Sequence, residues 1–347
     1  MSPKDGPKTA KADRVTIRTV ASRAGVSVAA VSKVLRNAYG VSDNLRGKVT
    51  VSIQELGYRP SRTARGLRGQ TFTIGLLLVD IGNPFLPGVI AGVNGVLAPS
   101  HYQAMIGVGE ARTQLETSLI ETMIDYKMDG LILVAPRLPS DVVAAFATQI
   151  PIVALGYHDA AAETFDTVNT DDQRGAELAV EALLECGYRD IAMLSQDAGE
   201  GYKVSVVRQR EIGYRRAMQR SGIEGEPEIV NIAIDSPRRE EAMRAFLVSG
   251  NRPRAIFCWS DLDAVTILSL AAELRIRVPE DLAVVGYDNS PTSALSLVNL
   301  ASIDQSGKQL GETATRTLLS RIEGRATATH ILTEPSLVRR ASLGLKL

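Results

Sequence analysis

The chain has few residues of the kinds that form disulfides, bind metals or catalyse reactions, and it has no run long enough to cross a membrane. Its 347 residues include 2 Cys and 3 His. Cys186 and Cys258 lie far apart in apolar or helical contexts, so we expect reduced core thiols. No apolar run approaches the ~20 residues of a membrane span, and the polar start lacks the apolar stretch of a secretion signal. We therefore expect a cytoplasmic protein that does not associate with membranes.

Motifs for nucleotide binding and nucleophilic catalysis are missing as well. No Gly-x-Gly-x-x-Gly follows a strand, and there is neither a Gly-Lys-Ser/Thr phosphate loop nor a nucleophile elbow. His101, His158 and His330 lack the spacing of metal ligands. We expect that the protein is not an enzyme and needs no metal or nucleotide cofactor.

The zero net charge of the whole chain conceals two oppositely charged parts. Residues 1–69 carry 14 Lys and Arg against 4 Asp and Glu, whereas residues 70–347 carry 25 against 35. The two parts therefore have net charges of +10 and −10, from 14 − 4 and 25 − 35. A basic module on an acidic body restricts phosphate attraction to one end of the protein. Double-stranded DNA is thus an expected partner of the first part.

The basic part has the pattern of three short helices. Thr16 can cap a helix with one apolar stripe that ends at Gly25, and Ser27 can cap a second helix from Val28 to about residue 37. A third helix follows from Ser42 to Leu56, with Leu45, Val49, Ile53 and Leu56 facing inward. On the second helix, the residues expected to face outward are Val28, Ala29, Ser32, Lys33 and Arg36. Such a helix-turn-helix places its second helix in the major groove.

The segments AGVSVAAVSKVL, YGVSDNLRGKV, ELGYRP and SRTARGL resemble the DNA-binding domain and hinge of LacI/GalR-type bacterial transcription regulators. The resemblance extends from about Thr16 to Arg340. It implies that Val28, Ala29 and Lys33 read bases, although Val28 and Ala29 could instead be plain helix surface. Lys33 stands where the family more often has Arg, so bidentate recognition of guanine is weakened here.

Residues 60–71 resemble the family hinge, which orders as a short helix when two subunits meet on an operator. The resemblance implies that Leu67 wedges into the minor groove, with Ala64 one helical turn before it. Gly66 should loosen this helix, and without DNA the segment can act as a simple flexible linker. Together with the head, the residues expected to bind DNA are Thr16, Ser27, Val28, Ala29, Ser32, Lys33, Arg36, Ser61, Arg62, Ala64, Arg65 and Leu67.

From Phe72 onward, short apolar strands alternate with helices, as in TIGLLLV, QAMIGVG, GLILVA and PIVALG, then IAMLSQ, EIVNIAI, AIFCW and LAVVGY. This order predicts an α/β core of parallel sheets covered by helices on both faces. Two groups of strands indicate two doubly wound lobes, which resemble the periplasmic-binding-protein fold. We expect a disordered extension at 1–14, a helix-turn-helix domain at 15–59 and a core at 72–347. Lobe 1 is expected at about 72–169 and 304–329, and lobe 2 at about 170–303 and 330–347.

In that fold the ligand binds between the lobes, at the carboxyl ends of the strands. The resemblance implies a small-molecule effector, a sugar or related metabolite, held by side chains from these loops. The expected effector contacts are Asp80, Asn83, Phe85, Arg210, Ser260, Asp288 and Gln305.

Several of these residues have simpler interpretations. Asn83 can start a helix after a turn, Asp288 can be a loop aspartate, and at least one of Asp171 and Asp172 should cap a helix. Ser260 precedes Asp261 where many family members have Asn-Asp, which removes a side-chain amide. For Trp259 we favour a core position over the edge of the cleft.

Three functions compete. A ligand-controlled DNA-binding regulator, most often a repressor and by default a homodimer, explains both parts of the chain. A transport-associated sugar-binding protein explains the body alone and would need a secretion signal. A sugar-modifying enzyme explains the sheets but would need catalytic residues, so we expect the regulator.

Overall fold

The computed structural model describes residues 15–35, 38–59, 70–197, 205–233 and 238–344. The chain divides into two compact units, residues 1–69 and 70–347. Within the described residues, no helix is both long enough and apolar enough to cross a membrane.

The first unit contains three helices, α1 (Ile17–Ala24), α2 (Val28–Leu35) and α3 (Asp43–Leu56). Thr16 caps α1 together with Thr19, and Gly25 ends it in the left-handed conformation that glycine adopts easily. The Ser27 side chain accepts the backbone N–H of Ala30 at 3.1 Å, as expected for a cap of α2. The helices pack around a small core formed by Val20, Ala21, Val31, Val34 and Val49.

The third helix differs slightly from its apolar pattern. Val49 is buried, but Leu45, Ile53 and Leu56 are only partly covered, and Ser52 is buried instead. The Ser52 hydroxyl donates to the Lys48 carbonyl at 2.9 Å, which satisfies it inside the helix. The buried face of α3 therefore includes a serine that the apolar spacing did not predict.

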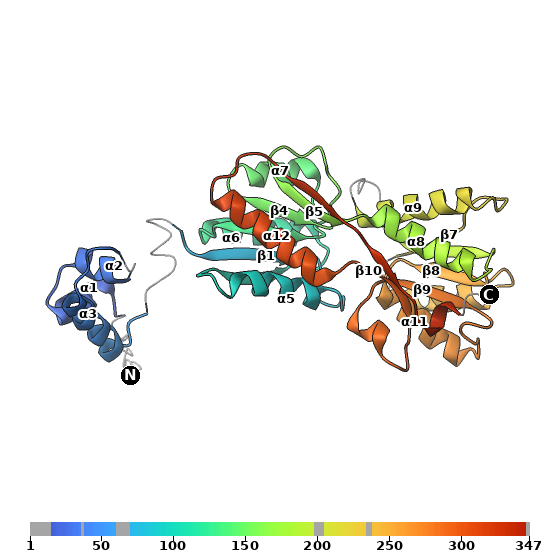
Figure 1. Cartoon of the computed structure of the whole chain (residues 1–347), viewed down its shortest axis with the longest axis horizontal. Coiled ribbons are helices and arrows are strands. Elements are labelled where there is room, and N and C mark those ends of the chain that lie inside the picture. Colours follow the sequence, from blue (N-terminus) through green and yellow to red (C-terminus); the bar gives the residue numbers. More distant parts are fainter. Residues whose placement is uncertain (1–14, 36–37, 60–69, 198–204, 234–237, 345–347) are drawn as a thin grey trace, which may run out of the picture. The chain divides into compact units, whose positions relative to one another are not determined.

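The second unit contains two six-stranded sheets flanked by helices (Figure 1). The first sheet has the order β11-β5-β4-β3-β1-β2, and every pairing in it is parallel. Its strands are β1 (Thr73–Leu78), β2 (Gln103–Val108), β3 (Gly130–Val134), β4 (Ile152–Leu155), β5 (Asp166–Thr170) and β11 (His330–Thr333). Its helices are α5 (Leu86–Leu97), α6 (Thr113–Asp125), α7 (Ser140–Ala147) and α12 (Gly307–Ile322).

The second sheet has the order β12-β10-β9-β8-β6-β7, in which only the β10–β12 pair is antiparallel. Its strands are β6 (Ile191–Asp197), β7 (Ile229–Ala233), β8 (Ala255–Cys258), β9 (Ala283–Asp288), β10 (Ala301–Asp304) and β12 (Ser336–Val338). Its helices are α8 (Asp172–Glu185), α9 (Val206–Arg220), α10 (Arg239–Val248) and α11 (Asp261–Glu273). The expected α/β architecture of two lobes is confirmed.

Two of the expected boundaries were wrong. Strand β11 pairs with β5 of the first sheet, so the last crossing between lobes falls between Thr333 and Ser336 rather than near His330. In Figure 1 this segment runs as a long ribbon from one lobe to the other. Thr71, placed in the hinge, is instead a buried residue of the second unit, and its backbone N–H donates to Asp129 Oδ1 at 2.9 Å.

Candidate functional site

The carboxyl ends of the second sheet hold a buried cluster around Arg210. This residue lies in the first half of α9 and is 2% exposed. Its Nε donates to Asp172 Oδ1 at 2.8 Å, and its Nη1 donates to the Trp259 carbonyl at 2.6 Å. Its guanidinium carbon lies 3.6 Å from the centre of the Tyr287 ring. Arg210 is therefore held by groups from three different elements.

Asp172 links this arginine to the other lobe. Its second oxygen lies 2.7 Å from Nε2 of His158, a lobe 1 residue that follows β4. Burial alone would raise the pKa of Asp172, but the Arg210 charge and the His158 hydrogen bond outweigh it and lower that pKa. One carboxylate thus joins the expected effector arginine to the opposite lobe.

The segment that carries His158 is itself anchored at the lobe boundary. The Tyr157 N–H donates to Asn169 Oδ1 at 2.6 Å, and Asn169 returns a bond from Nδ2 to the Tyr157 carbonyl at 3.0 Å. Tyr157 also forms an isolated antiparallel bridge with Ser205 of lobe 2. The position of His158 is therefore set by contacts on both lobes.

The packing of α9 against α8 explains why Arg210 reaches Asp172. A Cβ at Gly213 would lie 2.2 Å from the Gln173 carbonyl oxygen, so only glycine allows this approach of the two helices. The fully buried Tyr214 donates to the Ile191 carbonyl at 2.8 Å. Gly213 and Tyr214 fix the helix that presents Arg210.

Asp288 ends β9 and lies beside Gln305. The Gln305 amide donates to Asp288 Oδ1 at 2.6 Å, whereas Oδ2 is buried and has no partner among the described residues. Asp288 has a φ of 114°, a region that non-glycine residues rarely adopt. Burial raises the pKa of Asp288 to about 8, although the Arg210 charge opposes the shift. A strained, partly unsatisfied carboxyl group is typical of a binding site.

Asp261 fixes the loop after Asp288. Its two oxygens accept the Ser290 N–H at 2.7 Å and the Ser302 hydroxyl at 2.6 Å. Burial raises the pKa of Asp261. The neighbouring Ser260 is 2% exposed, and its hydroxyl oxygen accepts the Asp263 N–H at 3.2 Å as the cap of α11. The Ser260–Asp261 pair thus supports the strand ends, and the effector contact expected of Ser260 stays a prediction.

The lobe 1 candidates bond mainly within their own loop. Asp80 accepts the Gly82 N–H, and Asn83 Oδ1 accepts the Phe85 N–H at 2.9 Å, a local turn. Phe85 is half-buried and packs against Gly307. A Cβ added to Gly307 would lie 2.7 Å from the Phe85 ring. The structure therefore brings Arg210, Asp288 and Gln305 to one edge of the second sheet, while Asp80, Asn83 and Phe85 lie on a separate loop of lobe 1.

The sequence prediction did not assign Asp172, His158 or Tyr287 to the site, and it named Asp171 and Asp172 only as possible helix caps. Asp171 caps α8 by accepting the Arg174 N–H at 3.0 Å, which leaves Asp172 free to pair with Arg210. The sequence did contain a signal for Asp172. Two acidic residues stand at the start of one helix, and only one of them is needed as its cap. His158 had no signal of its own, since only folding brings it to Asp172.

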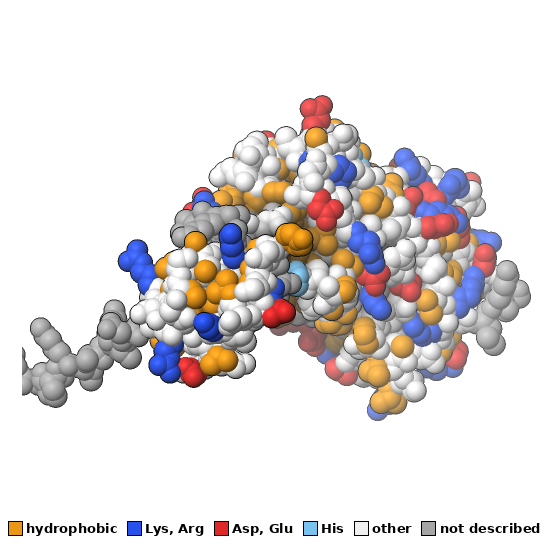
Figure 2. All heavy atoms as spheres, turned by 60° about the vertical axis from the view of Figure 1, so that its left-hand side comes forward, with side chains coloured by type: hydrophobic (Ala, Val, Ile, Leu, Met, Phe, Trp, Pro, Cys, Tyr) orange, Lys and Arg blue, Asp and Glu red, His pale blue; other side chains and the backbone are white. Residues whose placement is uncertain are grey.

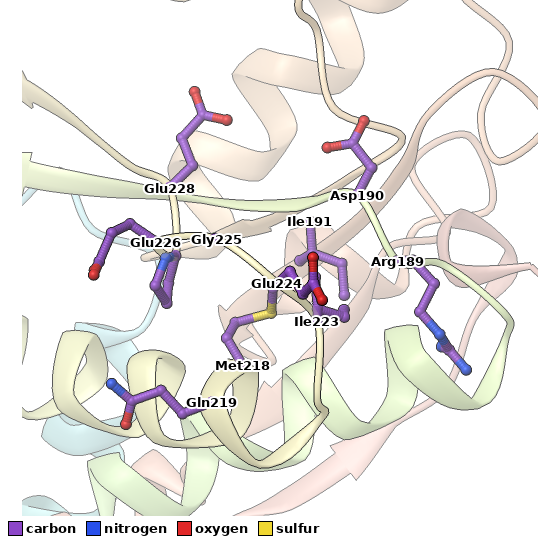
Figure 3. Close-up of a pocket in the computed structure, with 11 residues that line it drawn as sticks. Arg189, Asp190, Ile191, Met218, Gln219, Ile223, Glu224, Gly225, Glu226 and Glu228 are labelled. Carbon is purple, nitrogen blue, oxygen red and sulfur yellow. The ribbon is translucent and has the colours of Figure 1, made fainter.

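A cavity of about 360 Å³ lies elsewhere in lobe 2, at the opposite end of β6 (Figure 3). Its acidic lining residues are Asp190, Glu224, Glu226 and Glu228. It opens at the amino ends of β6 and β7, whereas ligands of parallel sheets bind at the carboxyl ends. We therefore do not place the effector there.

In the head, the outward face of α2 agrees with the expected pattern. Ala29 and Lys33 are exposed, while Val28 and Ser32 are partly covered. Figure 2 shows Lys and Arg side chains over the visible face of the head. Arg36, Ser61, Arg62, Ala64, Arg65 and Leu67 lie outside the described residues.

A helix-turn-helix head joined to a two-lobed α/β core defines a ligand-responsive transcription regulator. Residues 16–61 match the model of bacterial regulatory proteins of the lacI family, and residues 180–343 match a periplasmic binding protein-like domain. The repressor PurR of Erwinia tasmaniensis is 32% identical over 337 residues, which cover 94% of this chain and 96% of that protein. The ribose operon repressor of Haemophilus influenzae is 31% identical over 94% of this chain and 98% of its own.

Comparison with solved structures supports the same class of protein. The lac repressor dimer bound to operator and an anti-inducer aligns with a TM-score of 0.82 at 26% identity, over 95% of this chain and 99% of that one. The regulator CelR in complex with cellobiose aligns with a TM-score of 0.69 at 27% identity, over 95% and 100%. The chain belongs to the LacI family. It is a DNA-binding transcriptional repressor that responds to a small-molecule effector, and it is not an enzyme.

Proposed function

We propose that this repressor binds a pseudo-palindromic operator as a homodimer in the cytoplasm and is controlled by a sugar or related metabolite held between its lobes. The observation that carries the effector site is the Asp172 carboxylate, which bonds both to Arg210 and to His158 of the opposite lobe. A ligand that engages Arg210 acts on a group already connected to both lobes. The relatives named for ribose and for a cellobiose complex support a carbohydrate.

For the effector contacts, we propose Arg210, Asp288 and Gln305 as the polar centre and Asp80, Asn83 and Phe85 as the contribution of lobe 1. Asp288 Oδ2 offers an unsatisfied acceptor, or a donor when protonated, for a ligand hydroxyl. The Ser260 hydroxyl, which caps α11, would donate its proton to the ligand. These roles continue the assignments that the family resemblance implies.

For DNA, we propose that Lys33 on α2 is the main donor to base edges, with apolar contact from Val28 and Ala29. Thr16, Ser27, Ser32 and Arg36 would contact phosphates or neighbouring bases. Ser61, Arg62, Ala64, Arg65 and Leu67 would form the hinge contacts in the minor groove. Each assignment follows from the residue type and its place in the family pattern.

For the homodimer, an apolar sheet edge supports association through the cores. Strand β2 is the edge of the first sheet, and its Met105 and Ile106 are 54% and 50% exposed. Exposed apolar edges tend to associate with another chain. A second copy of this chain is the partner that a palindromic operator requires.

Selection of binding sites from random duplex DNA by the purified full-length protein tests the proposal. We expect a palindrome with a deformable centre to be enriched at moderate salt. Lys33→Ala should relax the base preference at one position of each half-site, whereas the control Lys48→Ala on α3 should leave the preferred sequence unchanged. If no sequence is enriched, with or without candidate sugars, the operator proposal is wrong.

A further inference from the structure

We infer that Trp259 contacts the effector directly, with its ring as an apolar wall and its indole N–H as a donor to a ligand oxygen. This inference rests on the proposed function, because it places the effector at the carboxyl edge of the second sheet. Trp259 is the only tryptophan in the chain. The sequence favoured a core position, and the residue does pack against the core of lobe 2; the inference adds a contact with the effector.

The backbone of Trp259 is fixed at the edge where the effector is proposed. The residue follows β8 directly, and its N–H donates to the Leu194 carbonyl at 2.9 Å. Its own carbonyl accepts from Arg210, whose guanidinium carbon lies 4.8 Å from the centre of the indole ring. A ligand that reaches Arg210 is therefore within reach of the indole.

The Trp259 side chain contacts both the core and Arg210. It is only partly buried, and it packs against the apolar cluster formed by α8, α9 and the sheet. Its Nε1 is buried and has no partner among the described residues. An indole nitrogen can only donate, and leaving such a donor unpaired costs about 1–3 kcal/mol. A purely structural role would be served without that cost by phenylalanine.

A second unpaired group lies on the neighbouring strand. Phe257 pairs with Val285 in the parallel register of β8 and β9, which sets Trp259 level with Tyr287 and one residue from Asp288. Adjacent strands are about 4.8 Å apart. Both residues also neighbour Arg210, whose guanidinium lies over the indole ring and whose charge acts on Asp288.

These groups suit a neutral carbohydrate ring. Each sugar hydroxyl can both accept from Nε1 and pair with the Asp288 carboxyl group, and the C–H face of the ring can cover the indole. Asp172 already balances the charge of Arg210. The cation next to the indole is therefore already neutralised, so an uncharged sugar fits this group better than a phosphate.

The single tryptophan provides the test. Full-length protein is titrated with a panel of neutral mono- and disaccharides that includes D-ribose and cellobiose, by calorimetry and tryptophan emission in parallel. We expect a sugar that binds to shift the emission. Trp259→Phe keeps a ring but removes the donor, and should weaken binding about tenfold, or ~1.4 kcal/mol. The control Tyr126→Phe, on an exposed site of lobe 1, should bind as the wild type does.

Two results would overturn the inference. One is a sugar that binds calorimetrically without altering the emission, and the other is a Trp259→Phe protein with unchanged affinity and melting temperature. If no sugar releases heat, the carbohydrate effector itself is contradicted. Acrylamide quenching of the ligand-free protein then decides the role of Trp259 separately. An indole accessible to acrylamide supports a place at the site, and a shielded one contradicts it.

Discussion

At the scale of single residues, the behaviour of the site follows from a few buried charges whose partners are specific. Arg210 and Asp172 are both almost completely buried, and their pair is extended by His158. A buried ion pair is weak evidence for net stability, but breaking it leaves one charge without compensation. The pair therefore constrains the site more than it stabilises the fold.

Removal of Arg210 should show this asymmetry. Arg210→Met leaves the Asp172 carboxylate buried, and we expect the free energy of unfolding to fall by about 3–5 kcal/mol. The double variant Arg210→Met with Asp172→Asn should recover part of that loss. Urea denaturation followed by circular dichroism measures both. If the double variant is less stable than Arg210→Met by the whole cost of Asp172→Asn alone, the two residues act independently.

The pKa of Asp288 predicts a pH dependence of stability. Its folded pKa is about 8, above the ordinary 3.8, so the folded protein binds more protons than the unfolded chain between these values. The stabilising contribution of protonation is present below about pH 4 and is lost as the pH rises toward 8. The charged residues that act on Asp288 are Arg210, Asp172 and Asp261. All three are kept in the variant Asp288→Asn.

Asp288→Asn removes this titration. We expect the variant to gain stability relative to the wild type between pH 5 and pH 8, by an amount on the order of a few kcal/mol. Denaturation at the two pH values gives the difference directly. An equal stability difference at pH 5 and pH 8 would show that Asp288 is ionised throughout.

At the scale of helices and strands, close approaches between backbones decide where the site residues lie. Glycine permits the contact of α9 with α8, and also that of α12 with α5, where a Cβ at Gly311 would lie 2.2 Å from the Val89 oxygen. The first contact places Arg210 against Asp172. The second contact packs α12, which follows a crossing between the lobes, against α5 of lobe 1.

Gly213→Ala tests the α8–α9 contact. Helix propensity favours alanine by up to about 1 kcal/mol, but the added methyl overlaps the Gln173 carbonyl, so we expect a net destabilisation of about 1–3 kcal/mol. Gly95→Ala in α5 is the matched control, because nothing lies within 4 Å of its Cβ position. That variant should be as stable as the wild type or more so. Thermal unfolding of both compares them.

The hinge is the element through which the DNA contact would be made selective. Leu67→Ala removes the proposed wedge and should weaken binding to the selected operator more than binding to random DNA, because the proposed intercalation would occur only on a bent operator. Fluorescence anisotropy on both DNAs at one salt concentration measures the ratio. Equal losses on the two DNAs would exclude a wedge at this position.

At the scale of the whole protein, the proposed regulation requires that effector and operator affect each other's binding by the same factor. The Asp172 contact to both lobes provides a physical link for such coupling. We expect a sugar that binds to change the operator affinity about 5-fold or more, and operator to change the sugar affinity equally. Titration of each ligand with and without the other checks this. Unchanged operator affinity at saturating sugar would disprove the switch.

Much of the fold and part of the candidate site followed from the sequence. The apolar strands of both lobes and the helix-turn-helix were readable because their periodicity and caps are local. The short strands β5, β10, β11 and β12 were not, since segments such as DTVNT and ASID carry too few apolar residues to stand out. For the same reason, the last lobe crossing was placed too early.

The sequence by itself determined the class of protein, the basic head and the two-lobed core, because these depend on residue types and spacings that are short in range. Arg210 and Asp288 became candidates through the family resemblance of the motifs around them. Only the tertiary structure decided that Asp172 pairs with Arg210 and His158, and that Trp259 keeps an unpaired donor beside them. Those contacts join residues from different strands and helices, and their partners are set by which chain segments pack together.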